Sequence, residues 1–145
     1  MDARALTLNS SFSEMARIVP WIEDVASRYA LPERTRFAMD LCLEEAISNI
    51  IRYGYAGEPG HAIVVRNLAN RDGFLTLVIE DAAPPFNPLA VRDLRMPRSL
   101  EQMSEGGLGI PLLKHFADAV EYERSPTGNR LIMRFVLSET TRAKT

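Results

Sequence analysis

Hydrophobic residues recur along this chain with two different periods, and each period predicts one type of secondary structure. Residues 4–9 alternate between apolar and polar side chains, which predicts an opening strand at the edge of a sheet. Residues 11–29 carry an apolar side chain every three or four positions, and Ser11 and Glu14 have the spacing of a capping box at a helix start. Pro20 lies inside this apolar stripe, so we expect either a kink or a later helix start.

A second helical pattern covers residues 33–53 and ends at a glycine. A connector rich in turn residues follows, and after it residues 63–65 and 74–80 have the composition of two strands. Residues 70–73 between these strands carry the signal of a hairpin turn that ends in glycine. The middle of the chain is therefore predicted to be a long helix followed by an antiparallel pair of strands.

The last third of the chain predicts a short helix and another hairpin. Residues 110–117 form the helical pattern, and residues 120–124 and 131–137 read as strands around a turn. Consecutive hairpins favour a mixed, mostly antiparallel sheet, and each long helix has one apolar face that can cover it. We therefore predict an α+β fold, a two-layer sandwich with helices on one face of the sheet.

Composition narrows the class of protein without naming an activity. With 145 residues, we expect a single domain over 1–145 whose last residues, 138–145, form a frayed polar tail. The single cysteine, Cys42, excludes an internal disulfide and a multi-cysteine zinc site, and it favours a cytoplasmic location. A net charge of -2 argues against direct nucleic-acid binding, and no apolar run is long enough for a membrane helix.

Three polar residues share one face of the second predicted helix. Glu45, Asn49 and Arg52 stand at positions i, i+4 and i+7. Glu45 could accept a proton, Asn49 could give its carbonyl oxygen to Mg²⁺, and Arg52 could pair with a phosphate. The alternative is an ordinary solvated helix face.

A carboxylate stands where the strand at 74–80 passes into a turn rich in proline. Asp81 could accept a hydrogen bond from an exocyclic amine such as that of adenine, and Phe86 could form an apolar pocket wall. The alternatives are that Asp81 caps the loop and that Phe86 seals the core.

A glycine-rich turn precedes the short helix predicted at 110–117. Gly106, Gly107 and Gly109 allow a ligand to approach the backbone closely, and the helix start offers free N–H groups to phosphate. The alternative is a simple helix entry. The chain has neither a P-loop motif nor a Rossmann glycine motif.

The order of these pieces resembles the ATP-binding fold shared by gyrase and histidine kinases, a Bergerat-type fold. Most closely, it resembles the small anti-sigma factor serine kinases of the RsbW and SpoIIAB type. The resemblance runs from about Leu6 to Phe135. The stretches that carry it are 45–55 (EAISNIIRYGY), 81–88 (DAAPPFNP), 106–119 and 128–131 (GNRL).

This resemblance implies a site for ATP and Mg²⁺. Glu45 would be the general base for the attacking hydroxyl group, Asn49 would ligate Mg²⁺, and Asp81 would bind adenine. Arg95 or Arg98 would reach the terminal phosphate. The residues assigned to nucleotide binding on this basis are Asn49, Arg52, Asp81, Ala83, Phe86, Arg95, Arg98, Gly106, Gly107, Leu108, Gly109, Ile110 and Asn129.

Three positions depart from the pattern of that family. The family usually has Asp-x-Gly at the adenine site, whereas this chain has alanine at position 83. The methyl group of Ala83 either fits beside the base or crowds it. Tyr53 stands where histidine is common, and Asn129 stands near a position that often holds threonine, which supports the adenine-binding aspartate.

The resemblance also implies an activity and partners. Such kinases phosphorylate a serine of a STAS-domain anti-anti-sigma protein and alternatively bind a sigma factor. A competing interpretation is a non-catalytic anti-sigma or adaptor module that binds nucleotide weakly or structurally. A third is an interaction domain that binds no nucleotide.

Two expectations concern surfaces for protein partners. Arg17 matches a family position that contacts partner proteins, although an exposed arginine on a helix is ordinarily just solvated. The family tends to dimerise through the sheet edge near the first strand, so Leu6 and Leu8 could serve a homodimer; the alternative for both is core packing.

Overall fold

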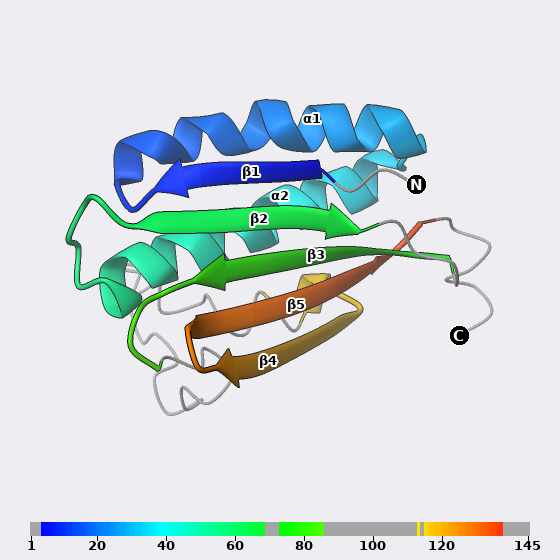
Figure 1. Cartoon of the computed structure of the whole chain (residues 1–145). Helices are drawn as coiled ribbons and strands as arrows, with labels where there is room; N and C mark the ends of the chain where they lie inside the picture. Colours follow the sequence, from blue (N-terminus) through cyan, green and yellow to red (C-terminus); the bar gives the residue numbers. More distant parts are fainter. Residues whose placement is uncertain (1–3, 69–72, 86–112, 114, 138–145) are drawn as a thin grey trace, which may run out of the picture.

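The structure, a computed structural model, describes residues 4–68, 73–85, 113 and 115–137. Five strands in the order β1-β2-β3-β5-β4 form one sheet, and every pairing among them is antiparallel. The helices lie over one face of this sheet (Figure 1). The elements are β1 (Arg4–Asn9), η1 (Phe12–Arg17), α1 (Ile18–Tyr29), α2 (Glu33–Asn49), η2 (Ile50–Gly54), β2 (Ala62–Leu68), β3 (Phe74–Asp81), β4 (Ala119–Ser125) and β5 (Gly128–Val136). The predicted α+β two-layer sandwich is confirmed.

The strand order brings together residues that are far apart in the sequence. β3 pairs with β5 instead of with its successor β4, so Asp81 at the end of β3 lies opposite Asn129 at the start of β5. β4 then pairs on the outer side of β5, with Arg124 opposite Asn129. Three polar residues from three strands therefore meet at one end of the sheet.

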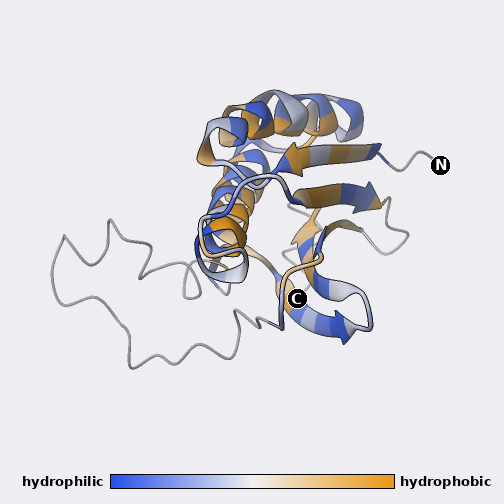
Figure 2. Cartoon of the chain, turned by 60° about the vertical axis from the view of Figure 1, so that its left-hand side comes forward, coloured by the Kyte–Doolittle hydropathy of each residue, from blue (hydrophilic) through white to orange (hydrophobic). Residues whose placement is uncertain are grey.

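The hydrophobic core lies between the helices and the sheet. Hydrophobic residues of the helices face the strands (Figure 2). Leu43 and Ile47 of α2 and Leu77 and Ile79 of β3 are at most 1% exposed. Full burial of each such side chain stabilises the fold by about 1.5–3 kcal/mol. Leu8 of β1 is also 1% exposed, so it packs in the core as one of the two sequence interpretations predicts.

The first helical segment begins differently from the prediction. Ser11 makes no side-chain cap, residues 12–17 form a 3₁₀ helix, and α1 begins only at Ile18. Glu14 Oε1 accepts a hydrogen bond from Asn9 N at 3.0 Å, which replaces the expected capping box. Pro20 falls in the first turn of α1, where a backbone donor is not needed, so the helix starts later instead of kinking.

The second helix extends to Gly54, but its last residues form the π-helix η2. Tyr55 N donates to Ile50 O at 2.9 Å, five residues back, in place of the usual four. π-Helical turns occur often at functional sites, because they change the direction in which side chains point. The sequence predicts the extent of this helix but not its widened end.

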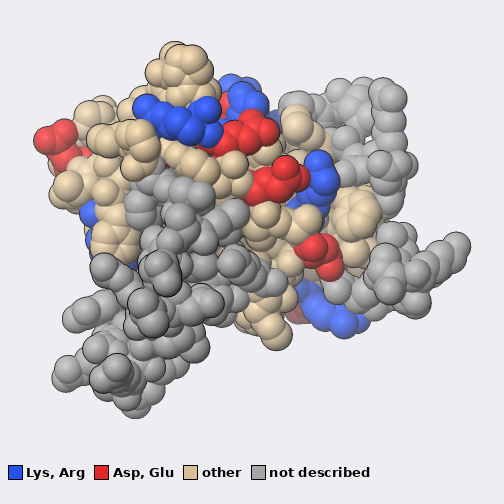
Figure 3. Space-filling view, turned by 90° about the horizontal axis from the view of Figure 1, so that it is seen from below, with Lys and Arg blue, Asp and Glu red and all other residues tan. Residues whose placement is uncertain are grey.

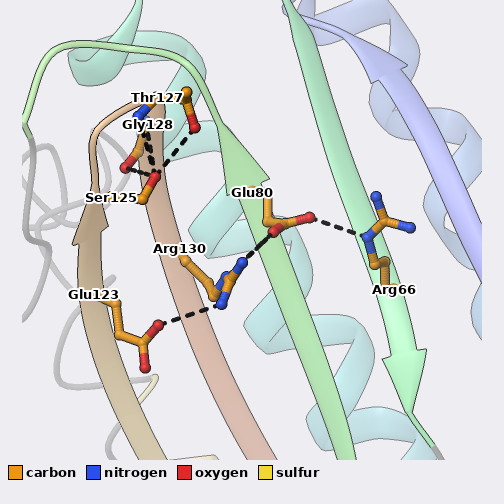
Figure 4. A network of polar contacts seen from close by, with 7 residues as sticks. All are labelled: Arg66, Glu80, Glu123, Ser125, Thr127, Gly128 and Arg130. Atoms are coloured by element: carbon orange, nitrogen blue, oxygen red, sulfur yellow. Dashed lines mark hydrogen bonds and ion pairs between the residues drawn. The ribbon is translucent and has the colours of Figure 1, made fainter.

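Charged side chains cross the face of the sheet that is opposite the helices. Glu80 on β3 bonds to Arg66 on β2 at 3.0 Å and to Arg130 on β5 at 3.0 Å, and Arg130 also bonds to Glu123 on β4 at 3.4 Å (Figure 4). The bond to Arg66, followed by that to Arg130, holds the pKa of Glu80 below its usual value. Exposed pairs of this kind each contribute about 0.2–1 kcal/mol.

Among the described residues, acidic and basic side chains also lie next to each other on the face seen in Figure 3. Within the described part of the chain, the structure has no helix of the length and apolarity that crossing a membrane requires. The predicted tail, 138–145, and four of the eight residues of the predicted helix at 110–117 lie outside the described residues.

Candidate functional site

Three buried side-chain oxygen atoms on α2 have no hydrogen-bond partner in the described structure: Asp40 Oδ1, Glu45 Oε2 and Asn49 Oδ1. The last two stand one helical turn apart on the face predicted to bind a ligand. Asn49 is only 4% exposed. A buried polar atom without a partner costs about 1–3 kcal/mol, so proteins rarely keep one unless a ligand or water satisfies it. This pair therefore indicates a ligand-binding surface, and it argues against the alternative of a solvated helix face.

The environment of Glu45 adjusts its acidity in two opposing directions. Burial raises the pKa of the carboxyl group above its usual value, because the charged form loses solvation, and the nearby positive charge of Arg52 lowers it. A carboxylate with a raised pKa is a stronger base than one in water. Glu45 therefore has the chemistry of a proton acceptor.

Arg52 lies beside aromatic rings. Its guanidinium carbon is 5.4 Å from the centre of the Phe12 ring and 5.8 Å from the centre of the Tyr53 ring. Both distances are within the range of a cation–π interaction. The face shared by Glu45, Asn49 and Arg52 is thus continued by exposed aromatic side chains from η1 and η2.

These donors fit the coordination chemistry of magnesium. Mg²⁺ prefers oxygen ligands, and it usually takes one or two from the protein and the rest from water and phosphate. Asn49 Oδ1 is such an oxygen and lacks a partner in the described structure. Among the described residues no cluster of three or more His, Cys, Asp or Glu side chains could hold a metal by itself. A Mg²⁺ ion held by Asn49 Oδ1 would take its other ligands from water and phosphate.

Asp81 forms the second part of the site, at the end of β3. Its Oδ1 accepts hydrogen bonds from Ala83 N at 2.9 Å and from Asn129 Nδ2 at 2.8 Å. One carboxylate oxygen therefore caps the turn, as one of the two sequence interpretations predicts. Both bonds use Oδ1, so Oδ2 is left to accept a donor from a ligand. Burial raises the pKa of Asp81, whereas the bonds from Asn129 and Ala83 lower it.

Asn129 holds the turn after Asp81 from the side of β5. Besides Asp81 Oδ1, its Nδ2 reaches Ala83 O at 3.2 Å and Pro84 O at 3.1 Å. Its own Oδ1 accepts a hydrogen bond from the hydroxyl group of Tyr122 on β4. A single buried amide thus binds the Asp81 carboxylate and two backbone carbonyl groups of the turn.

Arg124 and Tyr122 are site residues that sequence reasoning missed. Arg124 Nη1 donates to Ala83 O at 2.9 Å and to Asn129 Oδ1 at 3.3 Å. Tyr122 and Arg124 stand two positions apart on β4, so both side chains point to the same face of the sheet. This spacing is visible in the sequence, but it indicates a contact with Asn129 only when the register of β4 against β5 is known.

The methyl group of Ala83 points into the core. Ala83 is 1% exposed, and a Cβ built on Gly54 would lie 3.2 Å from Ala83 Cβ. Contacts that short are rare between real side chains, so glycine at 54 leaves the room that alanine at 83 fills. The end of η2 and the turn after β3 therefore pack directly against each other.

Several predicted nucleotide-binding residues cannot be related to this geometry because they lie outside the described residues. They are Phe86, Arg95, Arg98, Gly106, Gly107, Leu108, Gly109 and Ile110. Arg17, predicted to contact partners, is described. Its Nη1 donates to Thr7 O and to Glu14 Oε1, each at 2.9 Å, and half of its side chain is exposed.

Comparisons with known proteins give a consistent result. Residues 8–135 match the family model of the histidine kinase-like ATPase domain. The chain is 31% identical over 114 residues to the serine/threonine-protein kinase BtrW of Bordetella bronchiseptica. The aligned stretch covers 78% of this chain and 79% of that protein.

Solved structures show the same fold at lower identity. The histidine kinase domain of the blue-light activated histidine kinase of Erythrobacter litoralis EL346 aligns with a TM-score of 0.55 and 17% identity, over 90% of this chain and 62% of that one. The mycobacterial sensor histidine kinase MprB aligns with a TM-score of 0.54 and 17% identity, over 92% of this chain and 97% of that one.

Proposed function

This chain belongs to the histidine kinase-like ATPase domain family, and we propose that it is an ATP-dependent protein-serine/threonine kinase with an anti-sigma role in a partner-switching module. One observation carries the proposal. Glu45 Oε2 and Asn49 Oδ1 are buried without partners on one face of α2, where a general base and a magnesium ligand are required. The identity of 31% to a serine/threonine-protein kinase supports the same activity.

In this proposal Glu45 acts on the hydroxyl group of the substrate serine. The serine oxygen forms a bond to the terminal phosphorus of ATP, the bond to the ADP oxygen breaks, and the serine proton passes to Glu45 Oε2. Glu45 must be ionised to accept it, and the positive charge of Arg52 favours that form. Asn49 Oδ1 would hold Mg²⁺, which when bound neutralises charge on the phosphates.

Adenine recognition is assigned to the turn after β3. Asp81 Oδ2 would accept a hydrogen bond from the adenine amine, while Oδ1 stays bonded to Asn129 and Ala83 N. This division of roles between the two oxygens keeps the carboxylate in one orientation. A fixed acceptor selects for a base that presents a donor at that place, because an unmatched buried polar group is costly.

The proposed protein partners are a STAS-domain anti-anti-sigma protein, whose serine receives the phosphate, and a sigma factor. Arg17 is the residue assigned to these contacts, and its half-exposed side chain supports that assignment. We further propose a cytoplasmic homodimer that does not bind DNA or membranes itself. The mixed charges of the described residues in Figure 3 argue against nucleic-acid binding, and the edge position of β1 supports dimerisation.

The alternative of a non-catalytic adaptor was suggested by Ala83. Its methyl group is buried against Gly54 and fills space in the core. This packing supports the proposal that alanine is accommodated at position 83. The unpartnered oxygens of Glu45 and Asn49 also favour a catalytic site over a purely structural one.

Transfer of labelled phosphate tests the proposal. The protein is mixed with radiolabelled ATP, Mg²⁺ and a STAS-domain protein encoded beside it, together with the Glu45→Gln variant and Glu44→Gln as the matched control. We expect transfer to fall about a hundredfold or more in Glu45→Gln, with ATP binding kept, and to persist in Glu44→Gln. ATP binding without transfer by the wild-type protein would establish the adaptor instead, and no ATP binding would overturn both interpretations.

A further inference from the structure

Tyr55 connects the helix that carries Glu45 and Asn49 to the turn that carries Asp81. It follows η2 directly and is only 8% exposed. Its hydroxyl oxygen accepts a hydrogen bond from Ala82 N at 2.8 Å and donates one to Ala62 O at 3.2 Å. One side chain therefore joins the end of α2–η2, the start of β2 and the residue after Asp81.

We propose that Tyr55 is a positioning residue for nucleotide recognition, which holds the peptide between Asp81 and Ala83 in the conformation that presents Asp81 to the base. This inference rests on the proposed function, because it concerns the same nucleotide site. It adds a residue from the helical side, whereas Asn129 and Arg124 hold the turn only from the strands.

Three side chains hold the residues of the turn. Asp81 is bonded to Asn129, Ala82 to Tyr55, and the carbonyl group of Ala83 to both Arg124 and Asn129. Ala82 lies between Asp81 and Ala83, so rotation of the peptide that contains Ala82 N would break the hydrogen bond from Ala83 N to Asp81 Oδ1. Among the described side chains that hold this turn, Tyr55 is the one that binds the N–H group of Ala82.

The Tyr55 side chain is itself held in place. Its ring stacks on that of His61 with centroids 4.5 Å apart and an interplanar angle of 3°, and His61 Nε2 lies 2.7 Å from Glu58 Oε1. Burial raises the pKa of the Tyr55 hydroxyl group, so it keeps the proton that it donates to Ala62 O. The ring and the hydroxyl group are thus fixed independently, and the ring packing survives removal of the hydroxyl oxygen.

Contact between η2 and the turn is continuous beside this hydrogen bond. Gly54 packs against Ala83, and Tyr55 binds Ala82, so two consecutive residues of the helix end meet two consecutive residues of the turn. The helix that carries Asn49 and the turn that carries Asp81 are therefore held together by these two contacts. Loss of the contacts should change base recognition more than it changes the helix.

The test replaces Tyr55 with phenylalanine, which keeps the ring and removes both hydrogen bonds. Tyr29→Phe is the matched control, because Tyr29 is a partly buried tyrosine whose hydroxyl group binds Asn67 on the far side of the core. Affinities for ATP and for inosine triphosphate, which lacks the adenine amine, are measured by competition with a fluorescent ADP analogue. We expect Tyr55→Phe to weaken ATP binding about tenfold and inosine triphosphate binding much less, and Tyr29→Phe to change neither.

The outcomes separate this inference from the proposed function. Wild-type affinity for ATP in Tyr55→Phe, or an equal loss for both nucleotides, would overturn the positioning role while leaving the kinase proposal intact. Failure of the wild-type protein to bind ATP would overturn both. If Tyr55→Phe does not fold by circular dichroism, His61→Ala removes the stacking partner together with its exposed contact to Glu58, and the same preferential loss of ATP binding is then expected at a smaller size.

Discussion

The backbone carbonyl oxygen of Asp81 lies where a side chain at Gly128 would begin. A Cβ built on Gly128 would stand 1.8 Å from that oxygen and 3.0 Å from Ala82 Cα. No side chain can occupy that space, so β5 approaches the end of β3 more closely than a pair of ordinary residues allows. This close approach brings Asn129, the next residue, within hydrogen-bonding distance of the Asp81 carboxylate.

Substitution of Gly128 by alanine should therefore destabilise the protein. The added methyl group meets backbone atoms, which cannot move aside as a flexible side chain would. We expect the free energy of unfolding in urea to fall by about 2–3 kcal/mol. Thr127→Ala, an exposed neighbour in the same turn, serves as the control and should stay close to wild type. A Gly128→Ala protein as stable as wild type would show that the two strands do not approach this closely.

Replacement of Ala83 by glycine tests whether its methyl group touches the nucleotide. The methyl group is buried against Gly54, so its loss should lower the free energy of unfolding by about 1 kcal/mol. Calorimetric affinity for ATP should change less than about twofold, a free-energy difference below about 0.5 kcal/mol. A large gain in ATP affinity would instead mean that alanine at this position crowds the base.

Asn129→Ala should weaken ATP binding and make it more sensitive to acid. Asn129 lowers the pKa of Asp81, so its removal raises that pKa, and the carboxylate then becomes protonated at a higher pH. ATP affinity should accordingly be lost at a higher pH in the variant than in wild type when titrations are compared between about pH 4 and pH 8. Asn67→Ala is the matched buried control. We expect it to lower the free energy of unfolding but to leave the pH dependence of ATP affinity as in wild type. Identical profiles for Asn129→Ala and wild type would exclude this role.

The pH dependence of phosphoryl transfer should respond to Arg52. The positive charge of Arg52 lowers the pKa of Glu45, which burial raises. In Arg52→Gln the pKa of Glu45 rises further. The pH at which the transfer rate falls on the acidic side of its pH profile should therefore be higher than in wild type. The measurement is single-turnover transfer with saturating ATP, with Arg36→Gln as a control on the same helix. An acidic side of the pH–rate profile that is the same in Arg52→Gln and wild type would mean that protonation of a group other than Glu45 causes the loss of activity at low pH.

Glu44 should make the protein less stable as the pH rises toward neutrality. Burial, together with a hydrogen bond to Asp40, raises its pKa from 4.5 to about 7. The unfolded chain therefore loses this proton first, and the wild-type free energy of unfolding falls as the pH rises through that window. Glu44→Gln lacks this fall. In urea unfolding, the free energy of unfolding of Glu44→Gln minus that of wild type should therefore increase as the pH rises through the same window. Glu33→Gln, at the exposed start of α2, should follow wild type.

The sequence predicts the local parts of this molecule well and the distant contacts poorly. Residues 33–53 follow a helical period, and the spacing of Glu45 and Asn49 alone puts them on one face. In contrast, the pairing of Asp81 with Asn129 depends on β5 inserting between β3 and β4, a choice made by the whole sheet. The hydroxyl group of Tyr55 was missed for the same reason, because its partners lie 7 and 27 positions away.

The bond from Arg17 to Thr7 O has a practical consequence for experiments on partners. β1 is an edge strand, and exposed backbone groups on such an edge attract further strands from other molecules. Arg17 occupies one of these acceptors and adds a charge beside it, so this side chain limits non-specific strand pairing at Thr7. Replacing Arg17 would therefore change solubility along with partner affinity. A binding measurement on such a variant needs a sedimentation measurement at the same concentration, which shows whether the variant has aggregated.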